Sequence, residues 1–187
     1  MYDIIIIGSG PAGASAAMFS AKAGKKTLLI DNDRGMTRRA RFENYYAVKE
    51  ITGPEMVDTG IEQAKALGAT FVEDTATKVS KTDDSVAVET EKNTYNGKHV
   101  ILATGAAVTL AEASGVEVTD GTEPRIKKVV AVDANGKTNV ENVWAAGTCA
   151  GVSVHAIITA GDGAKVAINI ISELNGERYV DHDVLEK

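Results

Sequence analysis

The chain has 187 residues, a length that predicts about one domain. Hydrophobic residues make up 44% of the chain and charged residues 25%, a composition that excludes a disordered protein and predicts a buried core. The formal net charge is −6 and the basic cluster is limited to Arg38, Arg39 and Arg41, so a nucleic-acid partner has little support. No apolar stretch reaches the length of a membrane span, and no basic segment precedes the first apolar run. We therefore expect a cytoplasmic protein without membrane contact.

The first part of the chain predicts a β-α-β unit followed by a second helix. Residues 2–7 form an apolar run typical of a strand buried on both faces, and residues 11–23 are rich in alanine, as in a packed helix. Residues 27–30 predict the second strand. Residues 54–67 then predict an amphipathic helix that begins with proline and stops at Gly68.

The next segment changes character. Residues 69–102 contain the stretches ATFVED, TKVSK, SVAVET, TYNG and most of KHVILAT, which ends at Thr104, and they predict consecutive short strands separated by turns. Two further strands are predicted near 125–132 and 142–146, and a long final helix over 154–174. The chain should therefore be one α/β domain spanning residues 1–187, with a Rossmann-like parallel sheet, a small antiparallel β-meander and a long C-terminal helix.

Three spaced glycines lie between the first predicted strand and the first predicted helix. Gly8, Gly10 and Gly13 spell G-x-G-x-x-G, and Asp31 ends the second strand. Gly8 permits the tight turn, Gly10 lets a diphosphate approach the backbone, and Gly13 lets the helix pack close to the strand. The helix start would face the diphosphate, and Asp31 would accept hydrogen bonds from ribose hydroxyls. The pattern predicts an adenine dinucleotide, FAD or NAD.

Longer sequence segments distinguish between FAD and NAD. The chain resembles the FAD-binding domain of the low-molecular-weight thioredoxin reductases through GSGPAGASAAMFSAKAGKKTLLID, RFENYYAVKEITGPEM, HVILATGA and ENVWAAGTCAGVSVHAIITAGDGAKVAINI, in that order. The resemblance implies FAD as cofactor, with Asn44 contacting the flavin and the helix start at His155 and Ala156 beneath its pyrimidine edge. The expected cofactor-binding residues are Gly8, Gly10, Pro11, Ala12, Gly13, Asp31, Asn32, Asn44, Ala76, Ala103, Thr104, Gly105, Gly147, Thr148, His155 and Ala156.

The departures from the family pattern limit the activity. Members of the family insert an NADPH-binding domain with its own glycine fingerprint and a redox CxxC after the ATG segment, whereas this chain runs from Ala103–Gly105 directly into its final strands. The glutamine-containing G-G-Q segment appears as RGM, Arg34 to Met36, and the acid of A-G-D is replaced by Thr148. Thioredoxin reduction by the family's own route is therefore not expected of this chain, and FAD could be held more weakly.

Two residues are candidates for chemistry. Cys149, the single cysteine, could form an adduct or mixed disulfide near the flavin, or could be a small buried residue of the core. His155 could hydrogen-bond the flavin, or could contribute only its backbone. The three histidines, at 99, 155 and 182, have no metal-ligand spacing, so no metal is expected.

Two functions remain open from the sequence. The first is a single-domain FAD oxidoreductase that takes electrons from external NAD(P)H or from a partner reductase and passes them to an unknown acceptor. The second is a non-catalytic module that binds FAD or another adenine nucleotide, or a subunit of a larger assembly. The resemblance also implies a homodimer. The arginine cluster could clamp a phosphate or an acidic partner, or could simply be a solvated loop.

Overall fold

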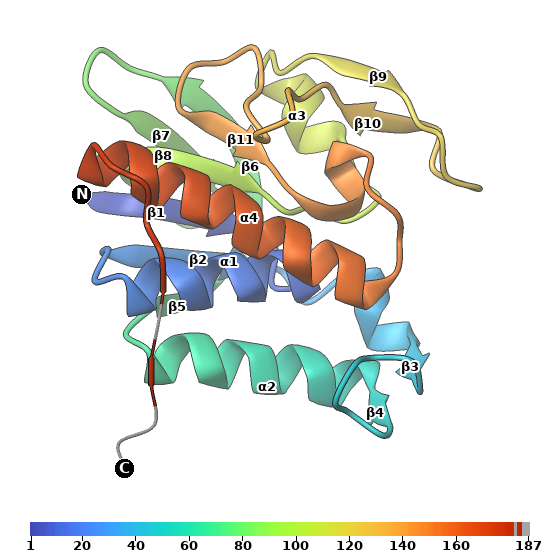
Figure 1. Cartoon of the computed structure of the whole chain (residues 1–187). Helices are drawn as coiled ribbons and strands as arrows, with labels where there is room; N and C mark the ends of the chain where they lie inside the picture. Colours follow the sequence, from blue (N-terminus) through green and yellow to red (C-terminus); the bar gives the residue numbers. More distant parts are fainter. Residues whose placement is uncertain (182, 185–187) are drawn as a thin grey trace.

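The structure, a computed structural model, describes residues 1–181 and 183–184 and is built on a seven-stranded sheet (Figure 1). The strand order is β5-β2-β1-β8-β7-β6, and β11 also pairs with β8. Strands β5, β2, β1, β8 and β11 run parallel, whereas β7 pairs antiparallel with β8 on one side and with β6 on the other. The sheet strands are β1 Tyr2–Ile7, β2 Thr27–Asp31, β5 Thr70–Glu73, β6 Ala76–Lys81, β7 Val86–Thr90, β8 Thr94–Leu102 and β11 Val143–Ala145. The predicted α/β class is confirmed.

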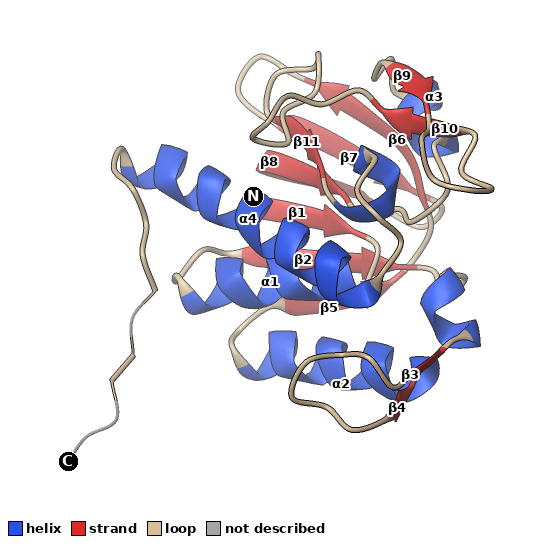
Figure 2. Ribbon diagram, turned by 45° about the vertical axis from the view of Figure 1, so that its right-hand side comes forward, coloured by secondary structure: helices blue, strands red, loops and turns tan. Residues whose placement is uncertain are grey.

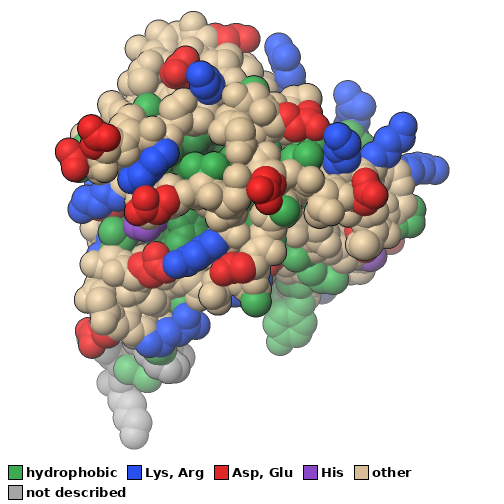
Figure 3. Space-filling view, turned by 90° about the horizontal axis from the view of Figure 1, so that it is seen from above, with side chains coloured by type: hydrophobic (Ala, Val, Ile, Leu, Met, Phe, Trp, Pro, Cys, Tyr) green, Lys and Arg blue, Asp and Glu red, His purple; other side chains and the backbone are tan. Residues whose placement is uncertain are grey.

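Helices and two small hairpins complete the fold. The helices are α1 Pro11–Lys22, α2 Gly53–Ala66, α3 Thr109–Ala113 and α4 Ala156–Asn175, with short 3-10 helices η1 Met36–Arg39 and η2 Gly147–Ala150. The hairpins pair β3 Arg41–Phe42 with β4 Ile51–Thr52, and β9 Val118–Asp120 with β10 Lys128–Val130. Acidic and basic side chains are interspersed over much of the face seen in Figure 3.

The isoleucine run of β1 supplies both faces of the sheet, because successive side chains of a strand point to opposite sides. Ile4 and Ile6 pack with α1 and α4 in one apolar cluster, whereas Ile5 and Ile7 pack with β6, β7 and α3 in the other. All four side chains are buried. A strand of this kind is continuous in apolar character rather than alternating, which is why its sequence signal is strong.

Helices α1 and α4 cross at very short range because their contact residues lack bulk. A Cβ on Gly163 would lie 2.0 Å from the carbonyl oxygen of Ala12, and one on Gly147 would lie 2.7 Å from the Ala12 Cβ. Neither contact leaves room for a side chain. The tight crossing places the start of α1 against η2 and against the turn of α4 that contains Gly163.

Several predicted boundaries were wrong in detail. The segment ATFVED forms β5, which pairs in parallel with β2 and does not join the meander, because it directly follows α2 in a second crossover. TYNG and KHVILAT merge into one strand, β8. Of the segment 125–132 only β10 is a strand, and its partner β9 and the short helix α3 were not predicted. The last helix begins at Ala156 because His155 is its extended N-cap.

A buried histidine of β8 predicts a pH-dependent stability. Trp144 Nε1 donates a hydrogen bond to Nδ1 of His99, which is only 7% exposed, and burial holds the pKa of His99 below its usual value of 6.5. His99 therefore binds a proton at a higher pH in the unfolded chain than in the folded chain, so the free energy of unfolding should fall as the pH drops through 6.5. We expect the melting temperature to decrease between pH 7.5 and pH 5.5, and this decrease should be larger in the wild type than in His99→Gln. An equal decrease in the two proteins would contradict this assignment.

Candidate functional site

The predicted site residues gather at one edge of the sheet. The carboxyl ends of parallel strands share an edge, which Figure 2 shows for β1 and β2, with η1 and the start of α4 at the same side. Gly8 follows β1, Asp31 ends β2, Ala103 follows β8, and Gly147 closely follows β11. The sheet thus brings together four segments that are far apart in the sequence.

The three glycines of the first turn have different surroundings. Gly8 has a φ of +109°, and a Cβ there would lie 2.2 Å from the Ala103 carbonyl oxygen. A Cβ on Gly13 would lie 1.7 Å from the carbonyl oxygen of Gly8, so this glycine permits the close packing of helix on strand. A Cβ on Gly10 would meet only the Thr37 hydroxyl, at 3.4 Å. The backbone at Gly10 is therefore the one that is open to an approaching group.

The N-termini of the helices around this turn differ in whether a side chain caps their free backbone N–H groups. Helix α2 carries a complete capping box between Thr52 and Glu55. Helices α1 and α4, with Gly10 and His155 as N-caps, have no side-chain cap and no acidic residue in their first turns. Their first-turn N–H groups and the positive ends of their dipoles suit an anionic group, which fits the diphosphate and reduced ring of a flavin dinucleotide.

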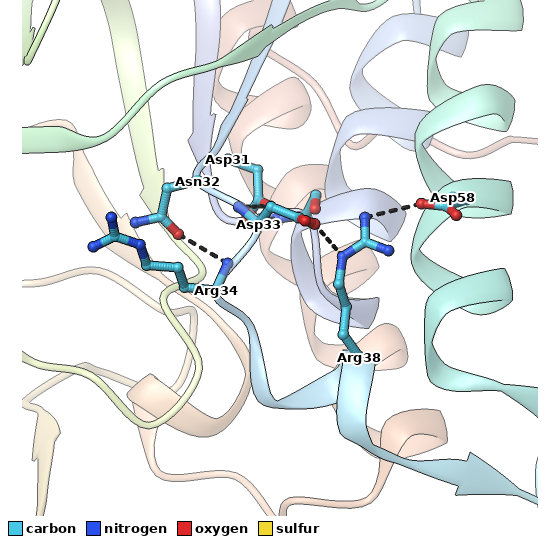
Figure 4. A network of polar contacts seen from close by, with 7 residues as sticks. Asp31, Asn32, Asp33, Arg34, Arg38 and Asp58 are labelled. Carbon is cyan, nitrogen blue, oxygen red and sulfur yellow. Dashed lines mark hydrogen bonds and ion pairs between the residues drawn. The ribbon is translucent and has the colours of Figure 1, made fainter.

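Asp31 links the glycine turn to the loop that follows β2. Its Oδ1 accepts a hydrogen bond from the Ser9 N–H and its Oδ2 accepts one from the Asp33 N–H, both at 2.9 Å. The backbone N–H of Asp74 also donates to the Asp31 carbonyl oxygen, at 2.9 Å. Asn32 accepts a bond from the Arg34 N–H in the same loop (Figure 4). The carboxylate is thus fixed in place beside the glycine turn.

The arginine cluster divides in the structure. Arg38 Nη2 donates to Asp58 Oδ1 of α2 at 2.9 Å, and its Nε forms an ion pair with Asp33 (Figure 4). Burial alone would lower the pKa of Arg38. The hydrogen bond to Asp58 and the charge of Asp33 outweigh this effect, so the pKa is raised overall. A cavity of about 340 Å³ lies here, lined by Asp31, Asp33, Arg38, Asp58, Ile61, Glu62, Lys65, Phe71 and Glu73.

Residues from the meander and from the strand ends complete the edge. Asp74, just before Ala76, is buried; burial alone would raise its pKa, but hydrogen bonds from Thr90 Oγ1 and the Thr75 N–H lower it overall. Ala76 opens β6 at this edge. The hydroxyl of Thr104 donates to the Ala107 carbonyl oxygen at 2.6 Å, and Gly105 has a φ of +65°.

Other predicted residues are placed less centrally. Pro11 occupies the first turn of α1, Ala12 lies buried in the crossing with α4, and Ala156 is buried at the start of α4. Asn44 is exposed in the β3–β4 loop beside a surface hollow shared with Arg41 and Glu43. Within the described residues, no hydrogen bond connects Asn44 to the glycine turn. His182 lies outside the described residues.

Cys149 and Thr148 lie in η2, close to the α1–α4 crossing. The Cys149 side chain is fully buried, its Sγ lies 3.1 Å from the Leu102 carbonyl oxygen, and burial raises the pKa of its thiol. A buried neutral thiol has the properties of a packing residue rather than a nucleophile. Beside it, Oδ2 of Asp162 accepts the Gly147 N–H at 2.8 Å, so a carboxylate that was not predicted supports this turn.

The environment of Cys149 predicts slow alkylation. Native protein treated with iodoacetamide at pH 8 should remain unmodified on a timescale in which unfolded protein is fully labelled, because the thiol is both buried and protonated. Mass spectrometry of the two samples measures the difference. Rapid labelling of the native protein would instead indicate a reactive thiol.

His155 is exposed at the N-cap of α4. Its Nδ1 lies 2.8 Å from Ser153 Oγ, and Ser153 Oγ in turn lies 3.4 Å from Glu123 Oε2. The backbone carbonyl of His155 accepts bonds from the N–H groups of Ile158 and Thr159. The imidazole is thus oriented by a neighbouring hydroxyl, while the backbone begins the helix.

Sequence reasoning missed Ser9, Thr37, Asp74 and Asp162, which act through hydrogen bonds or contacts formed only on folding. Within residues 1–181 and 183–184, no group of three or more His, Cys, Asp or Glu side chains is placed to hold a metal ion. None of the helices in this part of the chain is long and apolar enough to cross a membrane.

With this geometry established, comparison with known proteins gives the family. The pattern of the pyridine nucleotide-disulphide oxidoreductases matches residues 2–128, more than half of the chain. The chain belongs to this family. Members of the family that are thioredoxin reductases are recognisable relatives, so the resemblance inferred from the sequence is confirmed.

The relatives within this family are longer proteins. Thioredoxin reductase of Peptoclostridium acidaminophilum is 38% identical over 125 residues, which cover 65% of this chain and 40% of that protein. Thioredoxin reductase of Listeria monocytogenes is 35% identical over 126 residues, 65% of this chain and 39% of that protein. The chain thus spans about 40% of the length of the curated relatives it matches.

Solved structures of the family share the fold. A thioredoxin reductase from Gloeobacter violaceus superposes with a TM-score of 0.84 at 17% identity, covering 99% of each chain. An atypical thioredoxin reductase from Desulfovibrio vulgaris Hildenborough gives 0.77 at 18% identity, covering 95% of this chain and 99% of that one. At these identities the likeness establishes the architecture alone.

Proposed function

We propose that residues 1–187 form a single FAD-binding domain that acts as a flavoprotein oxidoreductase. The observation that carries this proposal is the pair of uncapped helix starts, α1 and α4, at the sheet edge where Gly10 is open and Asp31 is fixed. The α1 start and Gly10 would hold the diphosphate, Asp31 the ribose, and the α4 start the flavin ring. Membership of the pyridine nucleotide-disulphide oxidoreductases, which generally bind FAD, supports this choice.

The proposed activity takes electrons from outside the chain. FAD, when bound, supplies a ring that accepts a hydride and passes electrons on. This chain has one cysteine, which is buried, and a single glycine fingerprint, so we propose that it is not itself a thioredoxin reductase. Free NAD(P)H or a partner protein would donate the electrons, and the chain's own role is to hold the dinucleotide and stabilise negative charge at the start of α4.

An absorption spectrum of the purified protein, followed by anaerobic addition of NADH and then NADPH, tests this proposal. Flavin absorption that bleaches with either nucleotide would establish a self-sufficient flavin reductase. Flavin absorption that persists would exclude free NAD(P)H as the electron donor. Colourless protein that FAD does not restore would overturn FAD binding.

A non-catalytic nucleotide-binding module is the second candidate. The buried, protonated thiol of Cys149 favours it, because the chain's single thiol is then not available for dithiol or adduct chemistry. The two candidates differ in reduction: a module binds FAD or ADP but shows no turnover with any electron donor and acceptor pair.

The ribose contact gives a direct test of the nucleotide site. Replacing Asp31 with alanine should weaken binding of FAD and ADP by about 1–3 kcal/mol, because a charged hydrogen-bond acceptor is lost. Isothermal titration of both ligands measures the change. Unchanged affinity would show that the ribose does not contact this carboxylate.

We also propose a cytoplasmic homodimer. Val154, Ile157 and Ile158, which are 49%, 41% and 46% exposed, form an apolar surface around the start of α4 that a second copy would cover. Light scattering coupled to size exclusion would give twice the chain mass for the dimer, and Ile157→Glu should return it to the monomer.

A further inference from the structure

Arg38 differs from the other two arginines of its cluster. Its side chain is only 24% exposed and contacts carboxylates of two different segments, whereas Arg41 is 62% exposed and pairs with Glu43 and Glu50 at the surface. Arg39 is also exposed. The Arg38 Nη2 bond to Asp58 has hydrogen-bond geometry, while its Nε approaches Asp33 as an ion pair without that geometry. Arg38 therefore joins α2 to the loop after β2.

The loop that Arg38 holds has an unusual backbone. Asp33 adopts a φ of +59°, a left-handed conformation that residues with a side chain rarely adopt. In that conformation its N–H points to Asp31 Oδ2. The contact from Arg38 stabilises Asp33 in this state, so the guanidinium acts on the Asp31 carboxylate through one intervening residue (Figure 4).

The 3-10 helix that carries Arg38 is itself fixed. A Cβ on Gly53 would lie 1.8 Å from the Thr37 carbonyl oxygen, so η1 is pressed against the start of α2. On its other side, the Thr37 hydroxyl lies next to the open face of Gly10. Because η1 is packed on both sides, a displacement caused by substituting Arg38 should also displace the residues next to Gly10 in the nucleotide site.

We infer that Arg38 is a positioning residue of the nucleotide site, which orients the Asp31 carboxylate for the ribose by bridging Asp33 and Asp58. The inference rests on the proposed nucleotide binding. Its main competitor is a direct contact of the guanidinium with a ligand phosphate. The two carboxylates that already flank Arg38 favour the positioning role, because they neutralise the charge that a phosphate would need.

Titration calorimetry with AMP and ADP separates these roles. For Arg38→Ala we expect the dissociation constants of both nucleotides to rise by the same factor, about fivefold. Asp58→Asn should have an effect of similar size and direction, since it removes the charge that pairs with Arg38 from α2. Arg39→Ala, the matched control in the same 3-10 helix, should leave both constants unchanged.

A double-mutant cycle with Asp31→Ala adds a readout that general loosening of the fold would not give. If Arg38 acts through Asp31, Arg38→Ala should cause no further loss of affinity in the Asp31→Ala background. A larger loss for ADP than for AMP, or tighter binding by Asp58→Asn, would overturn the positioning role in favour of phosphate contact. Unchanged affinity in Arg38→Ala would overturn it outright, and wild-type protein that binds neither nucleotide would overturn the proposed function with it.

Discussion

Replacing Gly163 with alanine is expected to destabilise the protein by about 3 kcal/mol, a large effect for the addition of a single methyl group. The added Cβ would lie 2.0 Å from the Ala12 carbonyl oxygen, so α4 must move away from α1. Backbone atoms cannot give way as a flexible side chain can. Thermal unfolding should show a decrease in melting temperature of about 6–12 °C for a chain of this size.

Gly161 provides the matched control in the same helix. It is exposed, and a Cβ there meets nothing within 4 Å, so Gly161→Ala should stabilise α4 by up to about 1 kcal/mol through helix propensity alone. Opposite signs for two Gly→Ala changes only two residues apart would demonstrate that the crossing distance matters. Equal effects would mean that α4 can shift without cost.

The second large effect is expected at Gly10, and it concerns binding rather than stability. Gly10→Val should raise the dissociation constants of FAD and ADP by about 100-fold or more, because the side chain would occupy the space through which a diphosphate reaches the N–H groups of α1. The fold should survive. Gly10 has an extended backbone with φ of −63°, which any residue can adopt, and its nearest obstacle is the Thr37 hydroxyl.

Gly10→Ala should give an intermediate loss, and the stability cost of either change should stay near 1 kcal/mol. Calorimetric titration and thermal unfolding of the same samples distinguish the two effects. A Gly10→Val protein that binds nucleotide as tightly as the wild type would show that the diphosphate does not pass this residue, even if the glycine turn is intact.

The elements that sequence reasoning located best are those with a strong local signal. The apolar strand at Ile4–Ile7, the glycine turn and the alanine-rich helix after it can be recognised without knowledge of the rest of the chain. Helix α2 was equally clear because proline and Gly68 mark its ends. In each case local propensity and the final packing agree.

The elements that were missed depend on distant contacts. Strand β5 looks like the strands that follow it, and only its parallel pairing with β2 separates it from the meander. Helix α3 is five residues long, too short to show a helical period. The partners of Asp31 could not be predicted, since Ser9 contributes a backbone N–H that any residue would carry.

The same limit applies to the arginines. In the sequence Arg38 and Arg39 are neighbours of identical type, and nothing local tells them apart. The structure separates them because the 3-10 helix turns Arg38 toward α2 and leaves Arg39 exposed. A single turn of backbone thus decides which of two equal charges can influence the site.

The crossing of α1 and α4 has a consequence for how the protein is made. Helix α1 ends at Lys22, yet its covering helix α4 begins only at Ala156. Strand β1 likewise waits for β8, which ends at Leu102. The whole segment between these two helices must therefore leave the ribosome before α1 is covered, so folding should be slow and should depend on protection of that helix during translation.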